Sequence, residues 1–157
     1  YIYHTQLSEI ADLANAFPGV TIILNHVGGP LGVGPYAGKL DEVFQDWKEG
    51  MTAVAASPNV VVKVGGLVMP VCGFDWHERA MPTTSRELAQ VTAPYYLHCI
   101  EQFGPDRCMF ESNFPVDKIA CSYTVLWNAF KRLAHDFSPR EQAALFHDTA
   151  SRVYRLA

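Results

Sequence analysis

Three short apolar runs divide the chain, and each of them ends in polar or glycine residues. The runs cover residues 21–24, 60–62 and 108–110, and they are followed by NHVGGP, KVGG and ESNFP. Short apolar runs rich in β-branched residues are typical of strands that are buried on both faces of a parallel sheet. Helical stretches separate the runs, so the pattern predicts alternating strands and helices. In folds with such parallel sheets, the catalytic residues lie at the carboxyl ends of the strands.

The helices are predicted from apolar residues that recur every three or four positions. Predicted helices cover residues 7–17, 41–56, 85–103, 123–133 and 139–156. Asp41 is the expected N-cap of the second helix, and Thr84 with Glu87 resembles a capping box before the third. The last helix is expected to break near Asp148.

Residues 1–4 are predicted to be the end of a further strand. Four strand ends with their helices amount to half of a (βα)8 barrel, so the expected fold class is α/β. Half a barrel leaves two sheet edges open and its inner face half lined. We therefore expect one domain over residues 1–157 that forms part of a protein about twice as long.

Composition restricts the partners and the location. Of the 157 residues, 49% are hydrophobic and 18% are charged, which is ordinary for a globular domain. The net charge is −4 and no stretch clusters Lys or Arg, which argues against binding nucleic acid or an anionic membrane. No apolar run approaches the roughly 18 residues of a membrane span, and no signal peptide is visible. The cysteines lack CxxC spacing, which argues against structural zinc and fits a reducing cytoplasm.

Histidines at strand ends are the first candidates for chemistry. His26 ends an apolar run, and the glycines after it allow the backbone to approach a ligand closely. A neutral imidazole at this place could ligate a metal or act as a general base, whereas the alternative is a core histidine bonded to a carbonyl. His4 has the same strand-end position. Tyr3 and Gln6 beside it are candidate hydrogen-bond partners of a substrate.

Two long irregular segments provide further candidates. Residues 27–38 and 67–84 are too long for ordinary connections, and such segments are usually lids or binding loops. His77, in the second segment, could reach over the mouth of the barrel or lie in solvent. The apolar residues 67–74 are expected to be exposed. They could cap the site or contact a second copy of the chain, which leaves a homo-oligomer open.

The period of two of a β-strand predicts which residues of the last strand point into the barrel. If Asn113 points into the barrel, Glu111 and Met109 do as well, and the alternate residues face the helices. A carboxylate inside a barrel is costly unless it is paired. Lys63 ends the neighbouring strand, so we expect its charged end within about 4 Å of Glu111. Asp117, in the loop that follows, could face the mouth or the solvent.

These motifs resemble the second half of the amidohydrolase-related family. The resemblance is carried by LNHVGGP at 24–30, VKVGG at 62–66, FESNFPV at 110–116 and the last helix at 144–154. This family comprises metal-dependent-hydrolase-like TIM barrels that include sugar lactonases, pyrone dicarboxylate lactonase and some decarboxylases. The resemblance implies barrel strands five to eight, the C-terminal half, with a paired-histidine motif upstream.

The same resemblance implies a function. It is hydrolysis of a lactone or a related carboxylic-acid derivative, with a small carboxylate or lactone as the partner molecule. The alternatives are decarboxylation of an aromatic or unsaturated acid on the same fold, and a degenerate barrel without catalysis. The isolated chain is expected to lack activity if half of the site lies elsewhere.

One departure from the family concerns Asn113. It falls where the family usually carries an aspartate that ligates metal or activates the hydrolytic water. An amide cannot take a proton from water and is a poor ligand for a divalent cation. Glu111, or Asp117 reaching back, could supply the displaced carboxylate, or the protein could work without metal.

The expected site combines both lines of reasoning. His26 matches the family's strand-six histidine, which binds or polarises the substrate, and His4 corresponds to the strand-five position, often a metal ligand. The expected catalytic residues are His26, Glu111 and Asn113; the expected substrate-binding residues are Tyr3, Gln6, Lys63 and His77; the expected ligands of one divalent ion such as zinc are His4 and His26.

Overall fold

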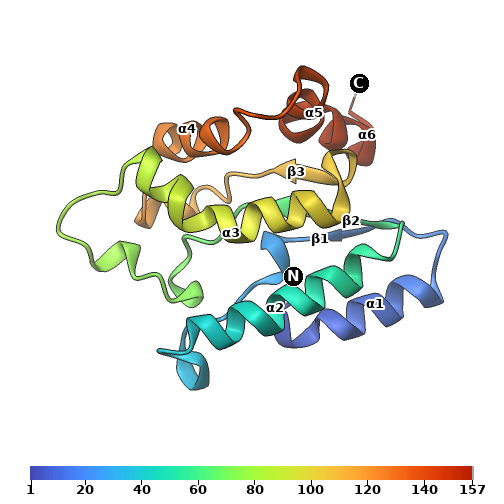
Figure 1. The fold of residues 1–157 in the computed structure, drawn as a ribbon, viewed down its shortest axis with the longest axis horizontal. Helices are drawn as coiled ribbons and strands as arrows, with labels where there is room; N and C mark the ends of the chain where they lie inside the picture. Colours follow the sequence, from blue (N-terminus) through green and yellow to red (C-terminus); the bar gives the residue numbers. More distant parts are fainter. Residues whose placement is uncertain (157) are drawn as a thin grey trace.

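The fold is built on a parallel sheet of three strands, as a computed structural model that describes residues 1–156 shows (Figure 1). The strands are β1 (Ile22–Leu24), β2 (Val60–Val64) and β3 (Cys108–Phe110), in the spatial order β1-β2-β3. Leu24 pairs with Val62, and Lys63 pairs with Met109. The predicted parallel sheet of alternating strands and helices is confirmed for these elements.

Each predicted helix is present, and its bounds differ by at most a few residues. The helices are α1 (Leu7–Ala16), α2 (Leu40–Ala55), α3 (Ser85–Phe103), α4 (Tyr123–Leu133), α5 (Pro139–Ala143) and α6 (Thr149–Tyr154). A π-helical turn at Ala144–Asp148 joins α5 to α6, so the interruption expected near Asp148 is a change of pitch. The hydroxyl of Thr84 caps α3 by accepting the N–H of Glu87.

Asp41 is not an N-cap, which corrects the prediction for α2. The helix begins one residue earlier, at Leu40, with Lys39 in the cap position. Asp41 and Glu42 therefore lie inside the first turn. Negative side chains are favourable there because the first backbone N–H groups of a helix carry partial positive charge.

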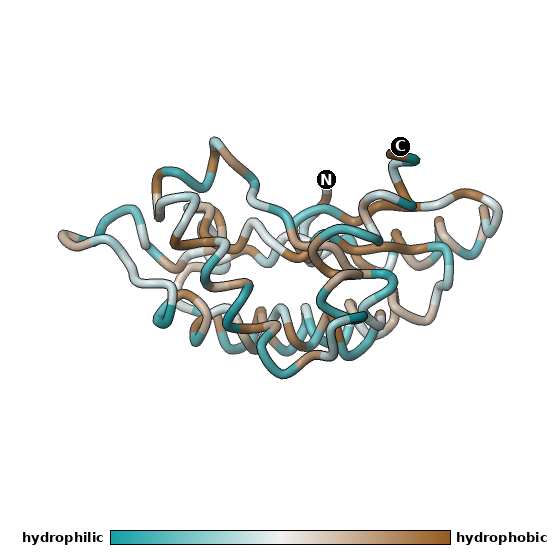
Figure 2. Tube along the Cα trace, turned by 90° about the horizontal axis from the view of Figure 1, so that it is seen from above, coloured by the Kyte–Doolittle hydropathy of each residue, from teal (hydrophilic) through white to brown (hydrophobic). Residues whose placement is uncertain are grey.

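The helices cover one face of the sheet. Val60, Val62 and Val64 of β2 alternate into this layer and are fully buried. Phe110 of β3 stacks on Phe130 of α4, with ring centroids 4.5 Å apart. Figure 2 shows the N-terminus on the side of the sheet opposite to the long helices α1, α2 and α3. Lys63 and Glu111 belong to this second face by the alternation of the strands.

Residues 1–4 do not form a strand, which corrects a second prediction. Tyr3 has an extended backbone, but His4–Gln6 forms a 3-10 turn that leads into α1. The N–H of His4 donates to the carbonyl of Gly29, at 3.1 Å. An extended segment becomes a strand through a ladder of such bonds with a neighbour, and a single bond does not make one.

The segment that follows β2 also differs from expectation. Leu67, Val68 and Cys72 are buried in the core and not exposed. Since these apolar side chains are already covered by the chain itself, they do not offer a surface for a second copy. Within residues 1–156, no helix combines the length and the apolar composition that crossing a membrane requires.

Candidate active site

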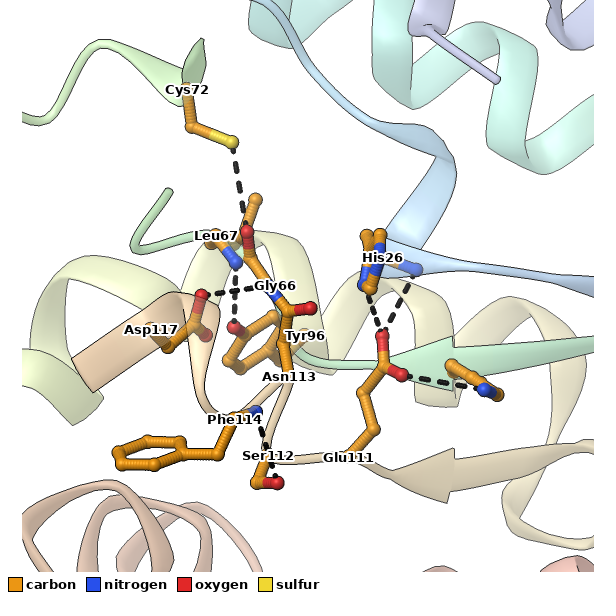
Figure 3. A network of polar contacts seen from close by, with 11 residues as sticks. His26, Gly66, Leu67, Cys72, Tyr96, Glu111, Ser112, Asn113, Phe114 and Asp117 are labelled. Carbon is orange, nitrogen blue, oxygen red and sulfur yellow. Dashed lines mark hydrogen bonds and ion pairs between the residues drawn. The ribbon is translucent and has the colours of Figure 1, made fainter. Parts of the chain in front are cut away.

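His26 and Glu111 form the centre of the site at the carboxyl ends of β1 and β3. The Nδ1 of His26 lies 2.5 Å from Oε1 of Glu111, and the backbone N–H of His26 donates to the same oxygen at 3.1 Å (Figure 3). An ionised carboxylate only accepts hydrogen bonds, so Nδ1 carries the proton and Nε2 is left as the basic nitrogen. Both residues were predicted to be catalytic, and the structure brings their side chains into contact; the catalytic role itself stays a prediction.

The backbone at His26 is itself unusual. His26 and Val27 have positive φ angles of 52° and 46°, a left-handed conformation that non-glycine residues rarely adopt. Such strain persists where the surroundings hold it in place, and it is often found at functional sites. Here the bonds to Glu111 hold it.

Lys63 is the ion-pair partner of Glu111, as predicted. Its Nζ lies 3.6 Å from Oε2 of Glu111, and the two side chains are 24% and 14% exposed. Tyr154, at the end of α6, places its ring centroid 5.7 Å from the same Nζ. Burial lowers the pKa of Lys63, but Tyr154 and Glu111 outweigh it, so the pKa is raised. Lys63 therefore stays charged beside the carboxylate.

Two glycines after β2 make room for this arrangement. A Cβ on Gly65 would lie 2.2 Å from the carbonyl oxygen of Glu111, and a Cβ on Gly66 would lie 2.7 Å from Nδ1 of His26. Gly66 also has a φ of 78°, which favours glycine. The VKVGG motif thus supplies Lys63 and the space in which His26 meets Glu111.

Asn113 lies near the pair and is held by Asp117. Its Nδ2 donates to Oδ1 of Asp117 at 2.7 Å, and Figure 3 shows the two side chains facing each other. Asp117 is fully buried, and its Oδ2 has no hydrogen-bond partner among the described residues. Burial raises the pKa of Asp117 to about 7, although Asn113 and His26 oppose the shift. The alternative that Asp117 faces solvent is therefore wrong, because the side chain is fully buried.

The predicted substrate-binding residues of the N-terminal segment have partners of their own. The side-chain oxygen of Gln6 accepts the N–H of Tyr3, at 3.2 Å. Nδ1 of His4 accepts the N–H of Leu31, and burial lowers the pKa of His4. Tyr1 lies against His26, with ring centroids 5.2 Å apart. Roles for Tyr3, Gln6 and His4 in binding stay predictions.

His77 lies outside the His26–Glu111 group. It lines a cavity of about 400 Å³ between the loop at 76–82 and the segment at 118–122, together with Trp76, Arg79 and Lys118. The lining of this cavity does not include His26. A binding role for His77 also stays a prediction.

The residues of this chain do not by themselves fit a metal ion. Among residues 1–156, no three His, Cys, Asp or Glu side chains gather closely enough to hold one. Nδ1 of His26 is engaged by Glu111, and Nδ1 of His4 by Leu31. The expected ligation by His4 and His26 would therefore use the remaining nitrogens and would need ligands from elsewhere.

Comparison with known proteins identifies the family. Residues 2–156 match the family model described as amidohydrolase. The chain belongs to the amidohydrolase family. An uncharacterized protein of Sinorhizobium fredii, y4mH, is 41% identical over 155 residues, which are 99% of this chain and 46% of that protein. L-fucono-1,5-lactonase of Burkholderia multivorans is 28% identical over 156 residues, 99% of this chain and 50% of the relative.

A solved structure agrees with this assignment. The crystal structure of an amidohydrolase from Burkholderia multivorans with bound Zn matches this amidohydrolase chain with a TM-score of 0.83 at 28% identity. The match covers 100% of this chain and 51% of that one. The chain thus spans about half the length of the relatives it matches.

Sequence reasoning missed two contributors to the site and left the placement of a third, Asp117, open. The place of Gly65 and Gly66 in the motif after β2 indicated that space is needed there. It did not indicate which atoms the two glycines lie against. The approach of Tyr154 to Lys63 had no signal, because it depends on how the last helix folds back. The burial of Asp117 had none either, because an irregular turn has no periodicity.

Proposed function

We propose that this amidohydrolase hydrolyses a lactone, with His26 as the general base and Glu111 as the residue that orients it. The observation that carries the proposal is the His26–Glu111 pair at the strand ends, in which Nε2 is left as the free base. The similarity to L-fucono-1,5-lactonase of Burkholderia multivorans supports a sugar lactone as the substrate class.

The proposed reaction uses this geometry. Nε2 of His26 takes a proton from water while the oxygen of that water bonds to the lactone carbonyl carbon. The negative carboxylate of Glu111 stabilises the imidazolium that forms. The bond between the carbonyl carbon and the ring oxygen then breaks, and the imidazolium returns its proton to the leaving oxygen. The product is a ring-opened hydroxy acid. Lys63 holds the carboxylate of Glu111 in place through their ion pair.

We further propose that the chain is one domain from the C-terminal half of a (βα)8 barrel, in which β1, β2 and β3 would be strands six to eight. Its parallel sheet and its coverage of about half of each relative support this. The two outer strands of the sheet, β1 and β3, would then pair with the neighbouring strands of the barrel. The lactonase activity is thus proposed for the whole protein of which this chain would be the second half.

The test is an assay of the full-length protein on six-membered and five-membered sugar lactones, followed by proton release and by identification of the ring-opened acid. We expect hydrolysis, and we expect His26→Gln to lower kcat by about a hundredfold or more. His135→Gln is the matched control, because His135 is a surface histidine. Release of carbon dioxide from an unsaturated acid would identify a decarboxylase instead, and equal activity of both histidine variants would refute the role of His26.

A further inference from the structure

We propose that Asp117 is a positioning residue that fixes the amide of Asn113 so that its oxygen, Oδ1, faces the His26–Glu111 pair as a hydrogen-bond acceptor. This inference rests on the proposed function, because it assigns Asn113 the task of orienting the hydrolytic water. It also explains how the amide of Asn113 could orient the water at a position where the family usually carries an aspartate.

Asn113 and Asp117 are joined by two hydrogen bonds. The side-chain Nδ2 of Asn113 donates to Oδ1 of Asp117 at 2.7 Å, and the backbone N–H of Asp117 donates to the carbonyl of Asn113 at 3.2 Å. The carbonyl of Asp117 in turn accepts the N–H groups of Ala120 and Cys121. The backbone of Asp117 is therefore held by hydrogen bonds of its own, in addition to the contact between its carboxylate and Asn113.

The chemistry of the two groups sets the direction of the amide. An ionised carboxylate has only acceptors, whereas an amide has a donor end and an acceptor end. Asp117 can therefore receive only Nδ2, and Oδ1 must lie on the other side. Figure 3 shows Asn113 in this orientation, with Asp117 on one side and His26 and Glu111 on the other. An oxygen in this place can accept one hydrogen of a water whose second proton goes to His26.

The burial of Asp117 points away from a purely structural role. The side chain is fully buried, and its Oδ2 has no partner among the described residues. Burying a carboxylate that is only partly paired costs stability, so its presence is not explained by packing. Tyr96, Cys72 and Cys121 lie close enough to interact with its charge, but burial raises the pKa of each of them, so they stay neutral and do not balance the carboxylate. The like charge of Glu111 raises the pKa of Asp117 further, whereas the hydrogen bond from Asn113 and the charge interaction with His26 lower it.

The experiment is a double-mutant cycle on the full-length protein, assayed at about pH 8, where a carboxylate whose pKa lies near 7 is mostly ionised. Asp117→Asn lets the Asn113 amide turn either way, so we expect kcat to fall by about tenfold with KM unchanged. In an Asn113→Ala background, Asp117→Asn should have no further effect on kcat, because Asp117 acts through Asn113. Asp136→Asn, on the surface, is the matched control. An equal loss of kcat in both backgrounds, or no loss in either, would overturn the inference.

A second measurement does not depend on turnover. The side-chain amide protons of Asn113 should be protected from solvent exchange in the unmodified protein and lose this protection in Asp117→Leu, as followed by NMR with labelled asparagine. Asp117→Asn takes its place if the leucine variant does not fold. Rapid exchange in the unmodified protein would overturn the inference. If no lactone is hydrolysed but the protection is found, the proposed function fails while the positioning of Asn113 stands.

Discussion

His26 donates both its backbone N–H and its Nδ1–H to one carboxylate oxygen of Glu111, although 85 residues separate the two in the sequence. The first bond fixes the strand end and the second fixes the ring and its tautomer. Both the position and the proton state of the imidazole therefore depend on a single side chain of another strand. Under the proposed function, this relationship would link stability and catalysis at the same residue, and suitable substitutions of Glu111 separate the two.

Glu111→Gln tests the catalytic side of this relationship. A glutamine oxygen can still accept the two bonds from His26, but it lacks the charge that stabilises the imidazolium. We expect kcat to fall by about a hundredfold while the fold is kept, measured by steady-state kinetics and circular dichroism. Asp148→Asn is the matched control, since it alters a similar pair with His147 on the surface. Unchanged kcat in Glu111→Gln would argue against the dyad.

Glu111→Ala tests the structural side. Removal of the carboxylate leaves Lys63 and the His26 N–H groups without their acceptor in a partly buried site. We expect the free energy of unfolding to fall by about 3 kcal/mol, as for other broken buried pairs, measured by urea denaturation. Adding Lys63→Met should recover part of this loss because the unpaired charge is then removed. Glu87→Ala, which breaks an exposed pair with Arg79, should matter far less.

The outcome for Glu111→Ala separates two roles. If this variant unfolds at the same urea concentration as the unmodified protein but has no activity, the carboxylate is catalytic and its pairing with Lys63 contributes little. If it unfolds earlier and Lys63→Met restores it, the ion pair contributes to the fold.

The parts of the site that could be predicted from the sequence are those that strand periodicity controls. Lys63 and Glu111 end neighbouring strands and alternate onto the same face, so their pairing follows from the period of two. Asp117 lies beyond this pattern, in a turn after Pro115 whose conformation depends on tertiary contacts. Residues 1–4 carry a strand-like pattern, but no strand among the described residues pairs with them through a ladder of backbone hydrogen bonds. The local pattern therefore did not decide their structure.

The fold shows the same difference between features that could be predicted from the sequence and features that could not. The long amphipathic helices were predictable because burial of one face repeats at helical spacing, as Trp47, Met51 and Val54 show by being fully buried. The cap of α2 was not, because a helix that starts one or two residues earlier costs little, so that either Lys39 or Asp41 could have been the cap. The apolar residues after β2 were expected outside and proved to be core, because apolar composition alone does not say which surface they meet.

Gly66→Ala tests whether the glycine at the end of β2 is required by His26. The added Cβ would lie 2.7 Å from Nδ1 of His26, and the φ of 78° disfavours alanine. We expect a loss of stability of about 1 kcal/mol or more from the backbone and a strong fall in kcat from the displaced ring. Gly38→Ala is the matched control, since its φ is 74° and no atom lies within 4 Å of the added Cβ.

The comparison between the two glycine variants isolates the contact from the backbone strain. Both should lose stability in thermal melts because both place alanine in a left-handed conformation. Only Gly66→Ala should lose activity. Equal kcat values in the two variants would show that the ring of His26 can move aside without consequence, and the proposed geometry of the base would then be wrong.

Asp117→Asn tests the raised pKa of the buried carboxyl group through the pH dependence of stability. Burial raises the pKa of Asp117 in the folded state to about 7 from an ordinary value of 3.8. Between these values the folded protein holds a proton that the unfolded chain releases. Rising pH therefore favours unfolding, by about 1.4 kcal/mol per pH unit for this group, and the effect ends above about pH 7 because both states are then ionised.

The measurement is urea denaturation of the unmodified protein and of Asp117→Asn at about pH 5, 6, 7 and 8. The other titrating groups are the same in both proteins. The difference between their free energies of unfolding therefore reports on Asp117 alone. We expect the variant to gain stability relative to the unmodified protein as pH rises to about 7 and to keep a constant advantage above it. Asp136→Asn, on the surface, should run parallel to the unmodified protein. A parallel curve for Asp117→Asn would mean that Asp117 is ionised in the fold at every pH tested, and the carboxyl group would then be better paired or more hydrated than its burial indicates.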